Sequence, residues 1–107
     1  MSEPLHDTID EVIHQRVRLA IVSTLAGVES LEFGDLKAML VLTDGNLSTH
    51  ARVLEGAGYL AIEKRFAGRK PQTLYRLTDE GRAAFRRYLD NLERMLRREN
   101  HSGRSRS

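Results

Sequence analysis

The apolar residues of this 107-residue chain change their spacing twice along the sequence, and this limits the folds that it can adopt. Up to about residue 58 they recur at the three- and four-residue spacing of one helix face. From Tyr59 to Leu77 apolar and polar residues alternate as in strands, and after Thr78 the helical spacing returns. A chain of this length has room for one domain of ordinary size. The pattern therefore predicts a mainly α domain with a small β-hairpin, an α+β fold.

The first part of the chain is expected to be helical with one short interruption. A short helix is predicted from Leu5 to Ile13, followed by a break near His14 and a longer helix that ends at Gly27. Residues 30–33 could add one strand-like rung, and the next helix is expected to begin near Gly34.

A turn is predicted at residues 42–46, which collect turn and helix-cap residues between two helical patterns. Beyond it Leu47, Ala51 and Leu54 fall on one face of a further helix, which is expected to end near Gly56. Two helices joined by a short turn form a helix-turn-helix. With the hairpin that follows, whose tip is expected at residues 68–72, the layout is that of a winged helix-turn-helix.

The last helix is expected to begin after its N-cap Thr78 and to run to about Arg98. Twenty helical residues span about 30 Å, which exceeds the roughly 13 Å radius of gyration expected for a domain of this size. Part of its apolar seam should therefore project and pack against a second copy, helped by the first predicted helix. The residues expected at this dimer interface are Leu5, Ile9, Val12, Phe85, Tyr88, Leu89, Leu92, Met95 and Leu96.

The net charge of +2 conceals a strong asymmetry along the chain. The first 50 residues hold three basic and eight acidic side chains, whereas the remainder holds fourteen basic and seven acidic ones. Between Lys64 and Arg76 there are five basic residues and no acidic residue. Such a distribution indicates that the second half faces nucleic acid.

The stretches Leu42–Leu60 and Gly68–Arg82 resemble the compact winged-helix transcriptional regulators related to the MarR and ArsR groups. Three short patterns carry the resemblance, which covers roughly residues 5–96: Asn-Leu-Ser-x-His at 46–50, Leu-Glu-x-Ala-Gly-Tyr at 54–59 and Leu-Thr-x-x-Gly-Arg at 77–82. Typical MarR proteins have further C-terminal helices, so the chain is more similar to the shorter relatives. The resemblance implies a regulator in which a small-molecule effector can bind at the dimer interface.

The candidate DNA-binding residues follow from the chemistry of base and phosphate recognition. Near the start of a recognition helix, Arg reads guanine, Asn reads adenine, and hydroxyls donate to bases or phosphates. A basic hairpin tip suits the minor groove or the phosphates, and Arg69 is the residue expected in the groove. The expected DNA-binding residues are Asn46, Ser48, Thr49, Arg52, Lys64, Arg65, Arg69, Lys70 and Arg76. His50 lies near the inner face and is expected to be packed and hydrogen-bonded.

Other classes of function find little support in the sequence. Cysteine is absent, and no Gly-x-Ser-x-Gly, P-loop, His-Glu-x-x-His or dinucleotide-binding pattern occurs, so no enzyme, metal site or cofactor is predicted. No apolar run is long enough for a membrane span, and the acidic amino terminus does not resemble a secretion signal. A cytoplasmic protein is expected.

The favoured hypothesis is a homodimer that binds a palindromic operator in double-stranded DNA and regulates transcription. Residues 1–99 would form its single domain, and residues 100–107 a disordered basic tail. Two alternatives remain open: a winged helix used for protein–protein contact, and an architectural DNA-binding protein without sequence preference.

Overall fold

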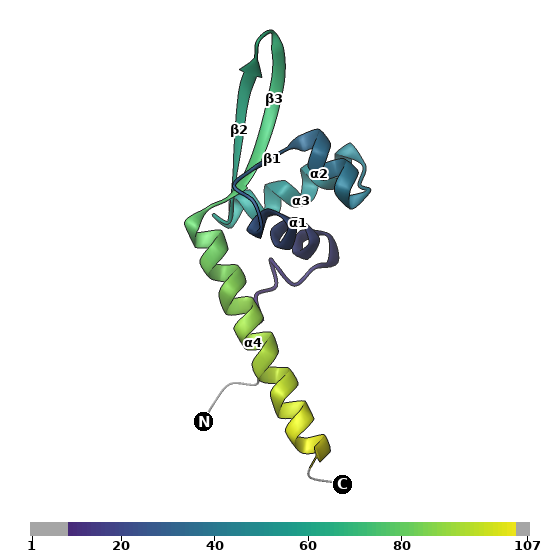
Figure 1. Ribbon diagram of the computed structural model, residues 1–107, viewed down its shortest axis with the longest axis vertical. Coiled ribbons are helices and arrows are strands. Elements are labelled where there is room, and N and C mark those ends of the chain that lie inside the picture. Colours follow the sequence, from purple (N-terminus) through teal and green to yellow (C-terminus); the bar gives the residue numbers. More distant parts are fainter. Residues whose placement is uncertain (1–8, 105–107) are drawn as a thin grey trace.

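The computed structural model describes residues 9–104, with side chains as far as Arg98. Along the chain its elements are α1 (Arg16–Ala26), β1 (Leu31–Glu32), α2 (Phe33–Leu40), α3 (Asp44–Gly56), β2 (Leu60–Ala67), β3 (Lys70–Leu77) and α4 (Asp79–Arg104). The three strands form one antiparallel sheet in the order β1-β3-β2 (Figure 1). The predicted α+β winged helix-turn-helix is confirmed.

The hairpin of β2 and β3 and the long helix α4 project in opposite directions from a body made by α1, α2 and α3 (Figure 1). The molecule measures 64 × 27 × 22 Å, and its radius of gyration is 16.9 Å. A compact domain of this length would have a radius of about 13 Å. Both projections therefore lie largely outside the globular body.

The core lies where the three short helices meet the base of the hairpin. Leu47, Ala51 and Leu54 of α3 are fully buried, as their spacing predicts, and they belong to the same cluster as Ile21 and Leu36. Burial of a Leu or Ile side chain contributes about 1.5–3 kcal/mol. This cluster holds α3 by its inner face and leaves its outer face to solvent.

The short first helix predicted from Leu5 to Ile13 is wrong for the part that the structure describes, since residues 9–15 form turns. Asp10 is the physical reason: its Oδ1 accepts hydrogen bonds from the backbone amides of Val12 (2.9 Å) and Ile13 (3.3 Å). A short side chain that binds nearby amides in this way competes with helix formation. Leu5 lies outside the described residues.

The hairpin turn is shorter than residues 68–72 and consists of Gly68 and Arg69 alone. Gly68 has φ +66°, as the first position of a type II′ turn requires. Pro71 belongs to β3, opposite Phe66. Proline is tolerated there because β1 pairs with β3 only further along the strand, so that β3 has no second neighbour at Pro71.

The pattern Leu-Thr-x-x-Gly-Arg at the start of α4 has a structural explanation. Thr78 caps the helix: its Oγ1 accepts from the amide of Gly81 (2.9 Å) and donates to the carbonyl of Gly58 (2.6 Å). A Cβ on Gly81 would collide with the backbone carbonyl of Tyr59. Arg82 donates to the carbonyls of Ala26 and Val28 at the end of α1 (3.1 and 2.9 Å).

Helix α4 continues to Arg104, beyond the end predicted at Arg98. It therefore includes residues 100–104 of the segment 100–107 that is predicted to be a disordered tail, while 105–107 lie outside the described residues. No helix within residues 9–104 combines the length and the hydropathy needed to cross a membrane.

Candidate nucleic-acid interface

Helix α3 is positioned by its buried face and by a hydrogen-bonded N-cap. The Oγ1 atom of Thr43 accepts from the amide of Asn46 at 3.1 Å, which satisfies one of the free amides at the start of the helix. Asn46, Thr49 and Arg52 are exposed, and Ser48 is half-buried. All four predicted recognition residues of α3 therefore lie outside the core.

An ion pair that sequence patterns did not predict joins the two helices of the helix-turn-helix. Lys37 Nζ of α2 lies 2.7 Å from Asp44 Oδ1 in the first turn of α3. This is the acidic residue of the α3 first turn, next to the predicted recognition residues. The lysine offsets a negative charge that would otherwise repel a phosphate. The two residues are seven positions apart, and the short turn between α2 and α3 brings them together.

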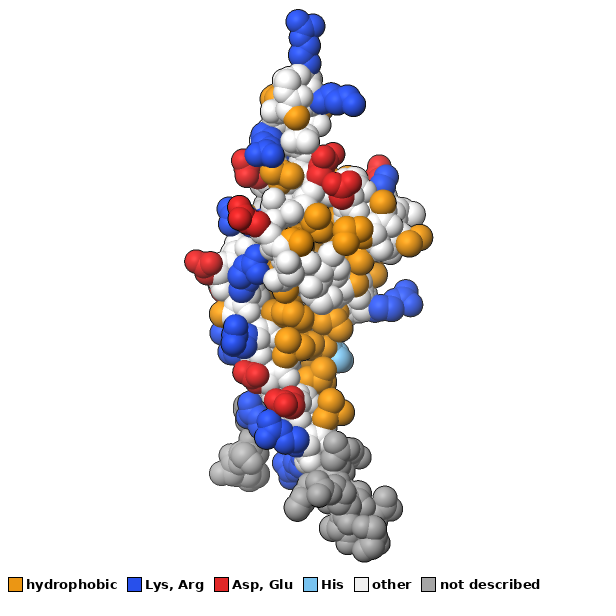
Figure 2. Space-filling view, viewed as in Figure 1, with side chains coloured by type: hydrophobic (Ala, Val, Ile, Leu, Met, Phe, Trp, Pro, Cys, Tyr) orange, Lys and Arg blue, Asp and Glu red, His pale blue; other side chains and the backbone are white. Residues whose placement is uncertain are grey.

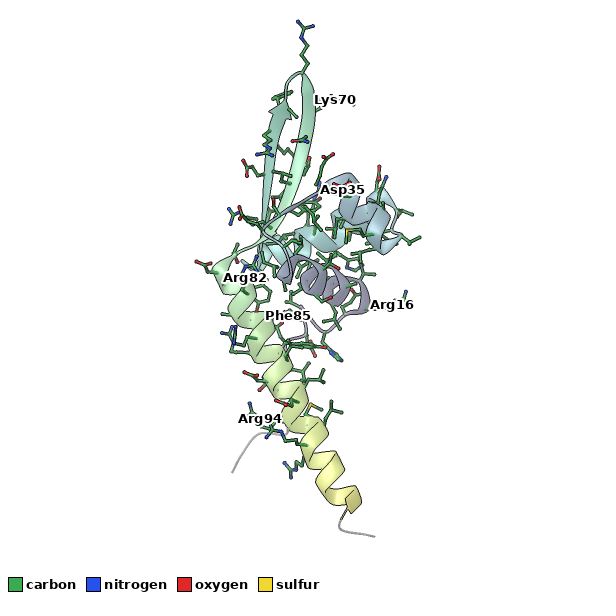
Figure 3. The ribbon with its side chains drawn as sticks, in the orientation of Figure 1. Arg16, Asp35, Lys70, Arg82, Phe85 and Arg94 are labelled. Atoms are coloured by element: carbon green, nitrogen blue, oxygen red, sulfur yellow. The ribbon has the colours of Figure 1, made fainter. Side chains whose placement is uncertain are left out.

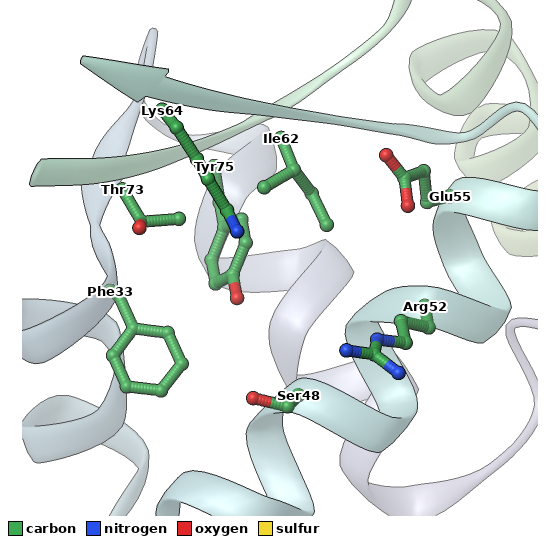
Figure 4. Close-up of a pocket in the computed structure, with 8 residues that line it drawn as sticks. All are labelled: Phe33, Ser48, Arg52, Glu55, Ile62, Lys64, Thr73 and Tyr75. Carbon is green, nitrogen blue, oxygen red and sulfur yellow. The ribbon is translucent and has the colours of Figure 1, made fainter.

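A groove of about 590 Å³ separates α3 from the hairpin (Figure 4). Arg52 projects into it from α3 and Lys64 from β2, and the hydroxyl groups of Ser48 and Thr73 line it as well. The complete lining is Phe33, Ser48, Arg52, Glu55, Ile62, Lys64, Thr73 and Tyr75. The groove thus places cations from two separate elements on one concave surface, an arrangement suited to a phosphate backbone.

Tyr75 closes the bottom of this groove. Its side chain is buried, and this burial, together with the carboxylate of Glu55, raises the pKa of its phenol; Arg52 acts in the opposite direction. The phenol stays neutral at physiological pH and can donate a hydrogen bond.

The two faces of the hairpin separate the predicted basic residues. Pairing of Ile62 with Tyr75 and of Lys64 with Thr73 puts these four residues on the face toward α3. Since neighbouring side chains of a strand point to opposite faces, Arg65 lies on the other side.

On that other face, the basic residues are accompanied by acidic ones. A hollow of about 300 Å³ there is lined by Glu29, Ser30, Ala61, Glu63, Arg65, Leu74 and Arg76. Arg65 Nε donates to Gln72 Oε1 (3.3 Å), and Gln72 Nε2 donates to Glu32 Oε2 (3.1 Å). Arg65 and Arg76 are therefore not brought together with Ser48, Arg52 and Lys64.

The tip of the hairpin carries the two remaining predicted basic residues. Arg69 lies in the turn and Lys70 is the first residue of β3; both are exposed. Lys70 lies at the far end of the hairpin (Figure 3), where it extends well away from the body.

His50 is half-buried and hydrogen-bonded, as expected from its position on α3. Its Nδ1 lies 3.1 Å from Nη1 of Arg18, which also donates from Nε to the carbonyl of Val12 (2.6 Å). Burial and the charge of Arg18 both lower the pKa of His50. The pair links α3 to α1, and Arg18 is a positioning residue that sequence patterns did not reveal.

Tyr88 of the apolar seam lies within the protomer's own core. Only 2% of it is exposed, and it packs with Ile13 and Ala84. Its hydroxyl lies 2.8 Å from Nδ1 of His14.

The other predicted interface residues divide by exposure. Ile9, Val12, Phe85 and Leu92 are half-buried against the core clusters, and Met95 is also half-buried. Leu89 and Leu96 are 47% and 58% exposed. Figure 2 shows apolar side chains gathered below the body, along the part of the molecule that α4 forms.

A helix-turn-helix with a polar outer face, followed by a basic antiparallel hairpin, defines a winged-helix DNA-binding protein. Residues 17–96 match the family model described as a winged helix DNA-binding domain. The chain belongs to this family, whose members bind DNA.

Two relatives are similar over most of their own length. An uncharacterized protein of Methanocaldococcus jannaschii is 37% identical over 79 residues, which cover 74% of this chain and 86% of the relative. The structure of a transcriptional regulator homologue from Pyrococcus horikoshii OT3 shares 33% identity, covers 81% of this chain and 86% of its own, and superposes with a TM-score of 0.77.

The fold also resembles that of a structure described as a transcriptional regulator of the MarR family from Enterococcus faecalis V583. The TM-score is 0.66 at 23% identity, over 90% of this chain and 83% of the other. The predicted class of winged-helix DNA-binding transcriptional regulator is confirmed, and its fold is shared with the MarR-family structure.

Proposed function

We propose that this chain is a homodimeric transcriptional regulator that binds a palindromic operator in double-stranded DNA. The carrying observation is the groove in which Arg52 of α3 and Lys64 of β2 face the same space. A duplex lying against α3 would meet both cations at once, one near base edges and the other near the backbone. The hairpin tip would then reach the adjacent minor groove or its phosphates.

The start of α3 is the part that would enter the major groove. Free amides and the helix dipole favour a phosphate at this end, where Asn46 and Thr49 are exposed in the first two turns; Arg52 is exposed one turn further along. A bidentate contact from Arg to guanine or from Asn to adenine discriminates against other bases by about 1–3 kcal/mol. We expect Arg52 to supply sequence preference. Lys64 is expected to bind the phosphate backbone and to supply affinity for all sequences alike.

A dimer would use the exposed part of the α4 seam. Leu89 and Leu96 are directed to solvent, while Ala84, Tyr88 and Leu92 in the first half of the helix pack on the body. Two-fold symmetry would place the two copies of α3 about 34 Å apart on one side of the duplex, which requires a palindromic site.

An effector site at this dimer interface is part of the same proposal. A groove of about 400 Å³ lies beside the base of α4, lined by Ala26, Arg82, Phe85, Arg86, Leu89 and Asp90. Its apolar side chains and its two arginines, which outnumber the single carboxylate of Asp90, suit a small organic anion. Dimerisation through Leu89 would enclose it.

Selection of bound sequences from random DNA, followed by titration at several salt concentrations, tests DNA recognition. Arg52→Ala should weaken binding to the selected site roughly tenfold or more and relax the preference for one base pair. Lys64→Ala should weaken binding to all sequences. It should also make the negative slope of log affinity against log salt shallower by about one. Arg76→Ala is the matched control, because Arg76 lies on the opposite face of the hairpin.

Absence of binding at low salt would overturn the proposed function and would favour a protein–protein module. Equal affinity for selected and scrambled DNA would favour an architectural protein. Equal losses for Lys64→Ala and Arg76→Ala would show that the duplex does not lie in the groove beside α3.

A further inference from the structure

Two apolar residues occupy the end of the hairpin next to the basic turn. Phe66 is 72% exposed and pairs across the strands with Pro71. Phe66 is two residues beyond Lys64 in the same strand and therefore lies on the same face, toward α3. Lys64 and Phe66 thus point to the same side of the hairpin, the side of the groove that Arg52 and Lys64 line.

Phe66 makes no contribution to the core of the body. The pair Lys64–Thr73 separates it from Ile62 and Tyr75, the outermost residues of the hairpin that pack against the core. At about 3.3 Å per residue, Phe66 lies about 13 Å beyond Ile62 along β2. Exposure of an aromatic ring so far from the core indicates a contact surface rather than a packing residue.

The surroundings of Phe66 favour nucleic acid as the partner. From Lys64 to Leu77 the chain has no acidic residue. Three basic residues lie within four positions of Phe66: Arg65, Arg69 and Lys70. The minor groove next to the major groove that α3 would occupy is half a helical turn away, about 17 Å. The five residues of β2 beyond Ile62 span about 17 Å, which matches this distance.

We propose that Phe66, supported by Pro71, inserts between two base pairs from the minor groove and kinks the operator. The inference rests on the proposed function, since it requires α3 to bind the neighbouring major groove. Apolar side chains inserted in this way unstack a base step and bend the duplex by about 20–90°. Flexible pyrimidine–purine steps are unstacked most easily, so the hairpin would add a sequence preference without a hydrogen bond to any base.

Duplexes recovered by selection from random DNA, labelled at both ends for energy transfer, provide the test. The full chain and three variants are compared: Phe66→Ala, Phe66→Leu, and the double variant F66A/A67F. The double variant keeps the composition and places the aromatic ring on the opposite face of β2. Because Phe66 is exposed, none of these changes should lower the melting temperature appreciably.

We expect the wild-type protein and Phe66→Leu to shorten the end-to-end distance of the duplex. Phe66→Ala and F66A/A67F should leave the duplex straight and bind roughly tenfold more weakly, with an unchanged dependence on salt. The unchanged salt slope distinguishes loss of the wedge from loss of a phosphate contact such as that of Lys64.

A wild-type complex with straight DNA, or equal bending by wild type and Phe66→Ala, would overturn the wedge and leave DNA binding intact. Failure of the wild-type protein to bind any duplex would overturn the proposed function itself.

Discussion

Val41 ends α2 in a left-handed conformation, with φ 54° and ψ 53°. Its amide bonds to the carbonyl of Ala38 and the next amide, of Leu42, bonds to that of Lys37, which is the hydrogen-bond pattern of a Schellman helix end. Glycine is the usual residue at such a position, because a β-branched side chain is strained there. The side chain of Val41 is 89% exposed, so no packing compensates for the strain.

Val41→Gly is therefore expected to raise the free energy of unfolding by about 0.5–1 kcal/mol. Relief of left-handed strain is worth about 1–2 kcal/mol, and the greater freedom of glycine in the unfolded chain offsets part of it. Urea denaturation measures the change. Val53→Gly, at an exposed position inside α3, is the control and should lower stability; a loss for Val41→Gly as well would contradict the strain argument.

Tyr59 and Asp10 form a contact between the start of the hairpin and the segment before α1. The hydroxyl of Tyr59 donates to Asp10 Oδ2 at 2.5 Å. This hydrogen bond, with burial and the charge of Asp10, raises the pKa of Tyr59 to about 12. Because the folded-state pKa lies above the ordinary value of about 10, the stabilisation is complete below pH 10 and is lost as the pH rises toward 12.

Tyr59→Phe should lower stability at neutral pH and reduce the further loss between pH 10 and 12. Denaturation midpoints of the variant and the wild type across this range give the difference in stability at each pH. Tyr75 and Tyr88, whose pKa values are also raised, are present in both proteins, so their contributions cancel in this difference. Parallel curves for the two proteins would show that Tyr59 is not responsible for the alkaline loss.

At the scale of elements, the start of α4 contacts both the exit of α3 and the end of α1. Thr78 donates a hydrogen bond to the carbonyl of Gly58, and Gly81 lies against the backbone of Tyr59. Arg82 donates hydrogen bonds to two carbonyls at the end of α1. Since α4 carries the proposed dimer seam, these contacts determine the angle between the seam and α3.

Gly81→Ala is expected to lower the free energy of unfolding by about 2–3 kcal/mol, because the added methyl group must displace the backbone of Tyr59. Gly34→Ala is the matched control: a Cβ there meets no atom within 4 Å, and alanine in a helix is more favourable than glycine. Thermal or urea denaturation compares them. Equal stability of both variants and the wild type would refute the close contact.

At the scale of the whole molecule, the two projections give the chain its extended shape and divide its proposed tasks. The hairpin extends toward the proposed DNA side, and α4 extends to the opposite end (Figure 1). Helix α4 has 26 residues, about 39 Å, of which only the first part packs on the body. A single copy leaves the apolar residues beyond Leu92 without a core to cover them.

Leu96→Asp should convert the dimer to a monomer in sedimentation experiments, because it places a charge in the apolar seam. Ala83→Asp adds the same charge to an exposed position about 140° away around α4 and should leave the dimer intact. Equal masses for wild type and Leu96→Asp would remove the seam from the interface.

Local patterns predicted most of the elements correctly. The three- and four-residue spacing identified α1, α2 and α3 to within a few residues, and the cap Thr78 marked the start of α4. The helix predicted before α1 was wrong because hydrophobic spacing does not account for a side chain such as Asp10 that binds its own neighbouring amides. Local preference is a reliable guide only where no such competition occurs.

The sequence by itself determined the order of helices and strands, the basic hairpin and the winged-helix class, because these depend on periodicity and on residues close together in the chain. Tertiary structure alone decided which of these residues share a surface. Strand register and packing against α3 place Lys64 with Arg52 and separate both from Arg76. Packing against the segment before α1 likewise buries Tyr88 and leaves Leu96 exposed. Such partners lie from 12 residues apart, as Arg52 and Lys64 do, to 75 apart, as Ile13 and Tyr88 do, and their meeting depends on the burial of the whole core.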